Sequence, residues 1–155
     1  MNTAVSNIEV IKAKTSKIHD VDFDHLSFGS TFSDHMLECN YKDGKWQAPK
    51  VVPYQPITLD PSAKIFHYGQ SVFEGMKAYK DAKNDIYLFR PLDNWKRLNI
   101  SSKRLAIPEV PESYFMEGLK TLLKLDSEWI PKKEGSSLYV RPFIFATGKG
   151  FHASP

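Results

Sequence analysis

Prolines divide the second half of the chain into two stretches that favour helices. The first, PLDNWKRLNISSKRLAIP, runs from Pro91 to Pro108. Proline suits the first turn of a helix and disrupts its interior, so these two positions predict a start and an end. Apolar or small residues recur on one face at helical spacing, at Trp95, Leu98, Ser102 and Leu105. The second stretch, PESYFMEGLKTLLKLDSEWIP, repeats this pattern, so we expect two successive helices.

Turn signals in the first half predict two hairpins. Asp43-Gly44 lies between extended, partly aromatic runs, which is a strong hairpin signal. The segment MKAYKDAKNDIYLFRP places a polar turn between two further strands. Between the hairpins, Gly69 and Gly75 bracket QSVFE, which we expect to form one or two helical turns that end at a glycine cap.

The remaining segments complete an α+β pattern. SSLYVRPFIFATG predicts a strand from Ser137 to Ala146, mostly apolar and therefore central in its sheet. Residues 1–24 are polar and predict a tail with one short strand at Ile8 to Ala13. Two hairpins, two helices and a returning strand indicate an α+β domain over residues 25–155, with a mainly antiparallel sheet and flanking helices.

Composition excludes several classes of protein. The 155 residues are 41% hydrophobic and 25% charged, as in an ordinary globular domain. The net charge of +3 comes from scattered Lys and Arg, so we expect no nucleic-acid partner. A single cysteine, Cys39, suits a reducing compartment, and no apolar run is long enough for a signal peptide or a membrane span. We therefore expect a cytoplasmic protein without a membrane partner.

Tyr139 and Arg141 are the first candidates for binding. Side chains alternate along a strand, so in LYVRP these two point the same way. A guanidinium beside a phenol suits a carboxylate or phosphate ligand. From spacing alone, the favoured interpretation is that Arg141 pairs with an internal Asp or Glu and Tyr139 packs at the sheet edge. Arg97 and Arg104, seven apart on the first helix, either bind an anion or belong to a solvated face.

The segment FHYGQSVFEGMKAY adds a dense aromatic cluster. Phe66, Tyr68, Phe73 and Tyr79 form either a wall of a small-molecule pocket or a core patch, and His67 favours a structural role. The sequence has no metal-ligand spacing, no phosphate-binding glycine loop and no nucleophile elbow. The residues alone therefore predict half of a small-molecule site.

Several motifs together resemble one enzyme family. HYGQSVFEGMKAY, LFRPLDNWKRL, DSEWIP and SSLYVRPFIFAT occur in this order, and FGSTFSDHML precedes them. In order and spacing they resemble the N-terminal domain of branched-chain amino acid aminotransferases, which are pyridoxal 5'-phosphate enzymes of fold type IV. The resemblance covers roughly residues 20 to 155 and implies amino-group transfer between leucine, isoleucine or valine and 2-oxoglutarate, with glutamate as the partner product.

The resemblance also implies roles for individual residues. Arg97 matches the arginine that holds the cofactor phosphate. Tyr139 and Arg141 match residues near the substrate carboxylates, and Phe28, Phe73 and Tyr139 match aromatics around the apolar side-chain pocket. Tyr68 matches a tyrosine that serves the neighbouring subunit of a homodimer. The loop Gly150 to Ala153, with Phe151, matches one that closes over the partner's pocket, although His152-Ala153 replaces the usual Gly-Val.

The resemblance further implies that the reaction needs a second domain. The family's lysine that bonds covalently to the cofactor, and the acidic residue at the pyridine nitrogen, belong to that domain, and no lysine here matches the catalytic position. We therefore expect no catalytic residue in this chain and no activity from it alone. Other fold type IV enzymes (a D-amino acid aminotransferase or an aminodeoxychorismate lyase) and a non-catalytic interaction domain are the alternative interpretations.

Overall fold

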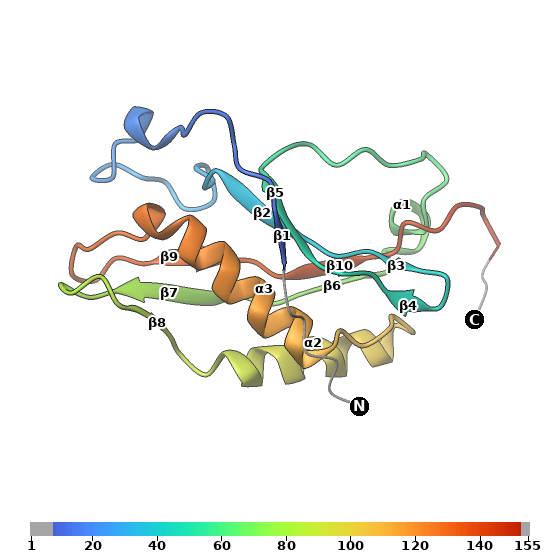
Figure 1. Ribbon diagram of the computed structural model, residues 1–155. Helices are drawn as coiled ribbons and strands as arrows, with labels where there is room; N and C mark the ends of the chain where they lie inside the picture. Colours follow the sequence, from blue (N-terminus) through green and yellow to red (C-terminus); the bar gives the residue numbers. More distant parts are fainter. Residues whose placement is uncertain (1–7, 153–155) are drawn as a thin grey trace.

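Two three-stranded sheets and two strand pairs form the framework of the computed structural model, which describes residues 8–152 (Figure 1). One sheet has the order β1-β5-β2, with β1 (Glu9–Val10) parallel to β5 (Lys50–Pro53) and β2 (His35–Glu38) antiparallel to it. The other, β8-β7-β9, is antiparallel and consists of β8 (Ile86–Leu88), β7 (Met76–Lys80) and β9 (Leu138–Val140). The antiparallel pairs are β3 (Tyr41–Lys42) with β4 (Lys45–Trp46), and β6 (Ser71–Phe73) with β10 (Phe143–Phe145).

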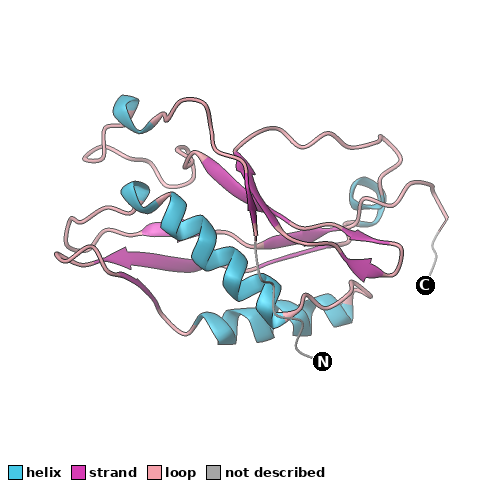
Figure 2. Ribbon diagram, viewed as in Figure 1, coloured by secondary structure: helices cyan, strands magenta, loops and turns pink. Residues whose placement is uncertain are grey.

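The two long helices lie in front of and below the strands in the view of Figure 2, whereas short helical turns lie at its upper left and at its right. The long helices α2 (Pro91–Arg104) and α3 (Glu112–Leu125) contact each other, and α1 (Lys64–Tyr68) is a single short turn. Two 3-10 helices, η1 (Ile18–Asp20) and η2 (Ser127–Trp129), complete the elements. The predicted α+β class is confirmed, as are both hairpins and both long helices. Within residues 8–152, no helix has both the length and the apolar character needed to cross a bilayer.

Two local predictions are wrong. QSVFE is not helical, because Ser71–Phe73 forms β6 and pairs with β10 about seventy positions later. The expected strand over 137–146 is split at Pro142, which has no N–H for a continuous ladder. Its first half, β9, is an edge strand of its sheet rather than a central one, and β7 occupies the centre.

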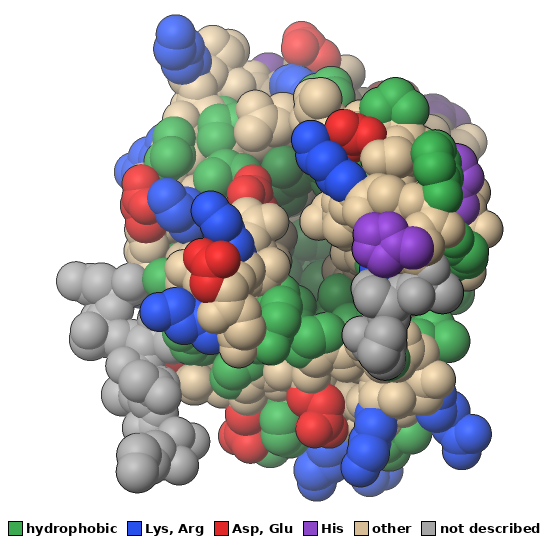
Figure 3. All heavy atoms as spheres, turned by 90° about the vertical axis from the view of Figure 1, so that its right-hand side faces the viewer, with side chains coloured by type: hydrophobic (Ala, Val, Ile, Leu, Met, Phe, Trp, Pro, Cys, Tyr) green, Lys and Arg blue, Asp and Glu red, His purple; other side chains and the backbone are tan. Residues whose placement is uncertain are grey.

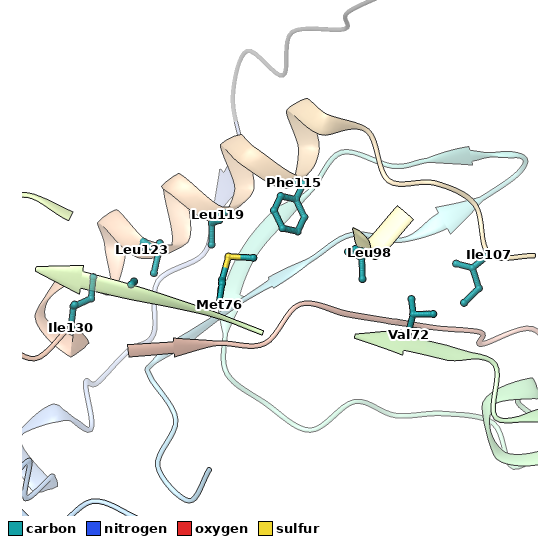
Figure 4. Close-up of a cluster of buried hydrophobic side chains, with 9 residues drawn as sticks. Val72, Met76, Leu98, Ile107, Phe115, Leu119, Leu123 and Ile130 are labelled. Atoms are coloured by element: carbon teal, nitrogen blue, oxygen red, sulfur yellow. The ribbon is translucent and has the colours of Figure 1, made fainter. Parts of the chain in front are cut away.

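A hydrophobic core joins the long helices to the strands (Figure 4). Apolar side chains from α2 and α3 pack on those of β6 and β7. The cluster comprises Val72, Met76, Ala78, Leu98, Ile107, Phe115, Leu119, Leu123 and Ile130. The buried face of each helix follows the sequence periodicity, with Leu98 and Ser102 buried on α2 and with Phe115, Leu119 and Leu123 buried on α3. The core therefore fixes α2, which carries Arg97, against β6, which carries Phe73.

Buried polar groups hold the N-terminal segment in place. The His35 Nδ1 lies 2.5 Å from Asp126 Oδ1, and the backbone N–H of Ala13 donates to His35 Nε2 at 2.8 Å. An Nε2 that accepts a hydrogen bond carries no proton, so Nδ1 carries the proton and donates it to Asp126. Asp34 similarly accepts a hydrogen bond from the indole of Trp129 at 3.0 Å. The segment around Ala13 is thus tied to the end of α3.

Candidate functional site

Four of the predicted site residues lie together around the end of β9. The Tyr139 hydroxyl accepts hydrogen bonds from Arg141 Nη2 at 2.9 Å and from Arg141 Nε at 3.2 Å. The same guanidinium lies 4.4 Å from the ring centroid of Phe73, and the Phe28 ring meets Tyr139 edge-on at 5.0 Å. Phe28 is 78% exposed and Phe73 63% exposed, so these rings are not core residues. An exposed aromatic cluster around a guanidinium can receive an apolar group and an anion side by side.

Two further predicted residues form a second cluster near the C-terminal end of the described chain. The Tyr68 hydroxyl donates to the backbone carbonyl of Phe151, and the rings of His67 and Phe151 meet edge-on at 4.8 Å. The other predicted loop residue, Ala153, lies outside the described residues. The Nε2 of His67 lies 2.9 Å from the Pro61 carbonyl oxygen, which supports its structural interpretation.

Arg97 is paired with a carboxylate that sequence analysis did not select. Its Nε lies 2.6 Å from Glu74 Oε1 and its Nη2 lies 2.5 Å from Glu74 Oε2. The Asn94 amide donates to Glu74 Oε2 at 3.0 Å. Glu74 is only 5% exposed, whereas the Arg97 side chain is 67% exposed. The sequence did carry a signal for Glu74, which stands between Phe73 and Gly75 in a mostly apolar stretch. A carboxylate that is buried there needs a cation or an amide as its partner.

Three other cations, Arg90, Arg104 and Lys80, have different surroundings. Arg90 pairs with Asp93 at 2.5 Å, and Arg104 is exposed at the end of α2. Lys80 has a side chain only 2% exposed, and its amine donates to the Ser127 carbonyl at 3.0 Å and to Glu128 at 2.8 Å. These two acceptors tie β7 to η2, so the amine of Lys80 has a structural role.

A wide groove opens beside the aromatic cluster. Figure 3, which views the molecule from the right-hand side of Figure 1, shows a hollow lined by hydrophobic side chains. The volume of the groove is about 2100 Å³, and Phe28, Tyr139 and Arg141 are among its lining residues. Typical small-molecule pockets occupy roughly 300–1,000 Å³, so the groove is too open to define one ligand by itself. Arg97 does not line it. Instead, Arg97 is hydrogen-bonded to Glu74, and the adjacent Gly75 lies against Tyr139. The two are so close that a Cβ added at Gly75 would overlap the Tyr139 hydroxyl.

The Glu74 carboxylate gives the fold an acid-sensitive ion pair. Hydrogen bonding from Arg97, supported by Asn94, holds the pKa of Glu74 below its ordinary value of 4.5, although burial acts in the opposite direction. The unfolded chain takes up this proton at higher pH than the folded chain does. The stabilisation is therefore complete above about pH 4.5 and is lost as the pH falls through the folded pKa.

We expect the free energy of unfolding to decrease from about pH 5 to about pH 3 more steeply in the wild-type chain than in E74Q. Urea unfolding curves over a pH series measure both slopes. Other carboxylates contribute equally to both proteins, so the difference between the two curves isolates Glu74. Parallel curves would contradict the proposed linkage.

Comparisons with known proteins agree on one class. No family model matches the chain. It is 47% identical over 148 residues to branched-chain-amino-acid aminotransferase 2 of Bacillus subtilis (strain 168), covering 95% of this chain and 40% of the relative. It is 53% identical over 127 residues to a probable branched-chain-amino-acid aminotransferase of Staphylococcus aureus (strain MRSA252), covering 81% of this chain and 35% of the relative. The chain thus spans about two fifths or less of the relatives it matches.

Solved structures show the same likeness. The branched-chain amino acid aminotransferase of Escherichia coli matches with a TM-score of 0.57 and 26% identity, over 79% of this chain and 36% of that one. The T.th. enzyme complexed with N-(5'-phosphopyridoxyl)-L-glutamate matches with a TM-score of 0.54 and 27% identity, over 77% of this chain and 36% of that one. The fold is therefore that of the N-terminal region of a fold type IV aminotransferase. Within that class, the chain corresponds by sequence and by fold to the N-terminal part of branched-chain amino acid aminotransferases.

Proposed function

We propose that this chain supplies one side of the active site of a pyridoxal 5'-phosphate-dependent branched-chain aminotransferase. The complete enzyme would transfer the amino group of leucine, isoleucine or valine to 2-oxoglutarate and release glutamate. The observation that carries the proposal is the cluster of Phe28, Phe73, Tyr139 and Arg141 in a chain 47% identical to such an enzyme. Residues 25–155 would be its N-terminal domain, and the lysine that bonds to the cofactor would lie in a second domain.

Arg97 fits the phosphate end of the cofactor. Its guanidinium is mostly exposed, and only Nε and Nη2 are hydrogen-bonded to Glu74. Within residues 8–152, Nη1 makes no hydrogen bond, so this edge of the planar group can bind a second anion. When bound, the cofactor would supply the electron sink for amino-group transfer, while the protein would orient it.

The aromatic cluster fits both kinds of substrate side chain. Phe28 and Phe73 would cover a branched aliphatic group. Arg141, which the Tyr139 hydroxyl and the Phe73 ring hold in place, would bind the distal carboxylate of glutamate. One site could then accept leucine and glutamate in turn without changing its residues.

Tyr68, Phe151 and Ala153 would serve the neighbouring subunit of a homodimer. A hydrogen bond joins Tyr68 to Phe151, and among the described residues neither makes a hydrogen bond or ring contact with the Phe28 cluster. Residues that serve the active site of another subunit are expected to lie apart from the site of their own subunit. The free thiol of Cys39 suits a reducing compartment, which supports action in the cytoplasm.

A chimaera tests this proposed function. We expect the chain alone to show no turnover of leucine with 2-oxoglutarate and pyridoxal 5'-phosphate. Joined to the part of the Bacillus subtilis relative that it does not match, it should transaminate leucine. Robust turnover by the chain alone, or a folded chimaera without activity, would contradict the proposal.

Arg97→Ala in the chimaera should weaken pyridoxal 5'-phosphate binding by roughly 10- to 100-fold, because a charge-assisted hydrogen bond contributes about 1.5–3 kcal/mol. Equilibrium dialysis measures the dissociation constant. Arg104→Ala is the matched control, since Arg104 is exposed on the same helix two turns later and should leave binding unchanged. Equal losses in both variants would show that Arg97 contributes only general positive charge.

A further inference from the structure

Glu74 connects the two ends of the proposed site. Its carboxylate accepts two hydrogen bonds from Arg97, and the Asn94 amide holds both Glu74 Oε2 and the Gly75 carbonyl, at 3.0 Å and 3.3 Å. Gly75 in turn lies against the Tyr139 hydroxyl, where a larger residue would overlap the phenol. Two adjacent residues thus contact the proposed phosphate-binding arginine and the proposed substrate-binding tyrosine.

Within the ion pair, the Glu74 carboxylate is held rigidly by the fold, and it determines the position of the Arg97 guanidinium. Glu74 is buried, and the backbone N–H of the same residue donates to the Pro142 carbonyl at 2.8 Å, which anchors the main chain beside its carboxylate. Arg97 extends from α2 with most of its side chain in solvent. A long exposed side chain samples many rotamers unless a rigid partner selects one. The two-point contact with Glu74 fixes both the position and the plane of the guanidinium.

We propose that Glu74 is a positioning residue that holds the free edge of Arg97 toward the phosphate of the bound cofactor. This inference rests on the proposed function, because the ligand is the cofactor phosphate assigned to Arg97 there. Glu74 itself would not touch the cofactor. It would order the Arg97 side chain before the phosphate binds, so that binding would not carry the entropic cost of ordering it.

Two opposite effects make the proposal testable. If Glu74 positions Arg97, its neutralisation frees the guanidinium, and phosphate binding must then order that side chain. If Glu74 acts mainly as a nearby negative charge, its neutralisation removes repulsion and strengthens phosphate binding. Arg97 is largely exposed, so solvent weakens the repulsion, and we expect the positioning effect to prevail.

The experiment uses the 155-residue chain with 15N-labelled arginine. Titration with pyridoxal 5'-phosphate, followed by NMR at the Arg97 Nε–H, should show about fivefold weaker binding in E74Q than in the wild type. Pyridoxal, which lacks the phosphate, should bind equally to both. Without ligand, the Arg97 Nε–H should be ordered in the wild type and mobile in E74Q. E117Q is the matched control, because Glu117 forms an exposed ion pair with Lys120 at 2.8 Å.

A second variant tests the same role independently, in case E74Q does not fold. Arg97→Lys keeps the positive charge but cannot form the two-point contact, so equilibrium dialysis should show a similar loss of affinity for pyridoxal 5'-phosphate. Equal or tighter binding by E74Q, or an Arg97 Nε–H that stays ordered in E74Q, would overturn the positioning role and leave the proposed function intact. If neither pyridoxal 5'-phosphate nor inorganic phosphate shifts the Arg97 Nε–H signal of the wild-type chain, Arg97 does not form an anion-binding site. Failure of the proposed function would appear separately, as an inactive chimaera.

Discussion

Leu98→Ala should lower the free energy of unfolding by about 2–5 kcal/mol, because it leaves a cavity where α2 packs on β6. Leu98 is only 2% exposed and belongs to the core cluster that holds this helix in place. Its neighbour Arg97 depends on the same packing for its position opposite Glu74. Urea unfolding monitored by circular dichroism measures the loss of stability.

Ile100→Ala is the matched control for this substitution. Ile100 lies two residues further along α2 but is 60% exposed, so its truncation should change stability by less than about 0.5 kcal/mol. Similar losses for both variants would mean that α2 does not pack through the Leu98 face.

Asp126→Ala is the second substitution with a large expected effect, a loss of about 2–5 kcal/mol. Asp126 accepts hydrogen bonds from both the ring and the backbone N–H of His35, at 2.5 Å and 3.1 Å. Removing the carboxylate leaves two buried donors without acceptors, and each unsatisfied donor costs roughly 1–3 kcal/mol. Asp126→Asn keeps one acceptor oxygen and should cost less.

Hydrogen exchange tests the local consequence of Asp126→Ala. Asp126 selects the tautomer of His35 whose Nε2 accepts the N–H of Ala13. Without that carboxylate, the amide of Ala13 should exchange faster than in the wild type. The amide of Phe115, which donates to the Pro111 carbonyl in the first turn of α3, serves as the internal reference. Unchanged exchange at Ala13 would show that the N-terminal segment is held by other contacts.

The proposed site differs from its sequence-based prediction mainly in how the residues are connected. Phe28, Phe73, Tyr139 and Arg141 lie in contact as a set, although Phe28 is more than a hundred positions from Tyr139. The motifs could place these residues in one family, but could not show that Arg141 binds the phenol rather than an internal carboxylate. The burial of Glu74 and its contact with Arg97 were equally invisible, because they depend on how α2 packs on the strand.

Several elements of this protein are specified by residues that are close together in the sequence, without help from tertiary contacts. The Asp43-Gly44 pair adopts positive φ at both residues, 54° and 75°, as a tight hairpin turn requires. Helix α2 begins at Pro91, and its buried face follows the 3.6-residue period. These features depend only on neighbours within a few residues, so the amino-acid sequence specifies them directly.

Tertiary structure decided the features that depend on distant partners. Ser71–Phe73 became a strand because β10 provides its hydrogen-bonding partner, and the segment 138–145 divided because its two halves pair with different strands on either side of Pro142. A short segment has little intrinsic preference, so the hydrogen bonds and burial that the rest of the fold offers outweigh local propensity. The same physical reason places a buried carboxylate opposite Arg97, and with it the geometry from which the function is inferred.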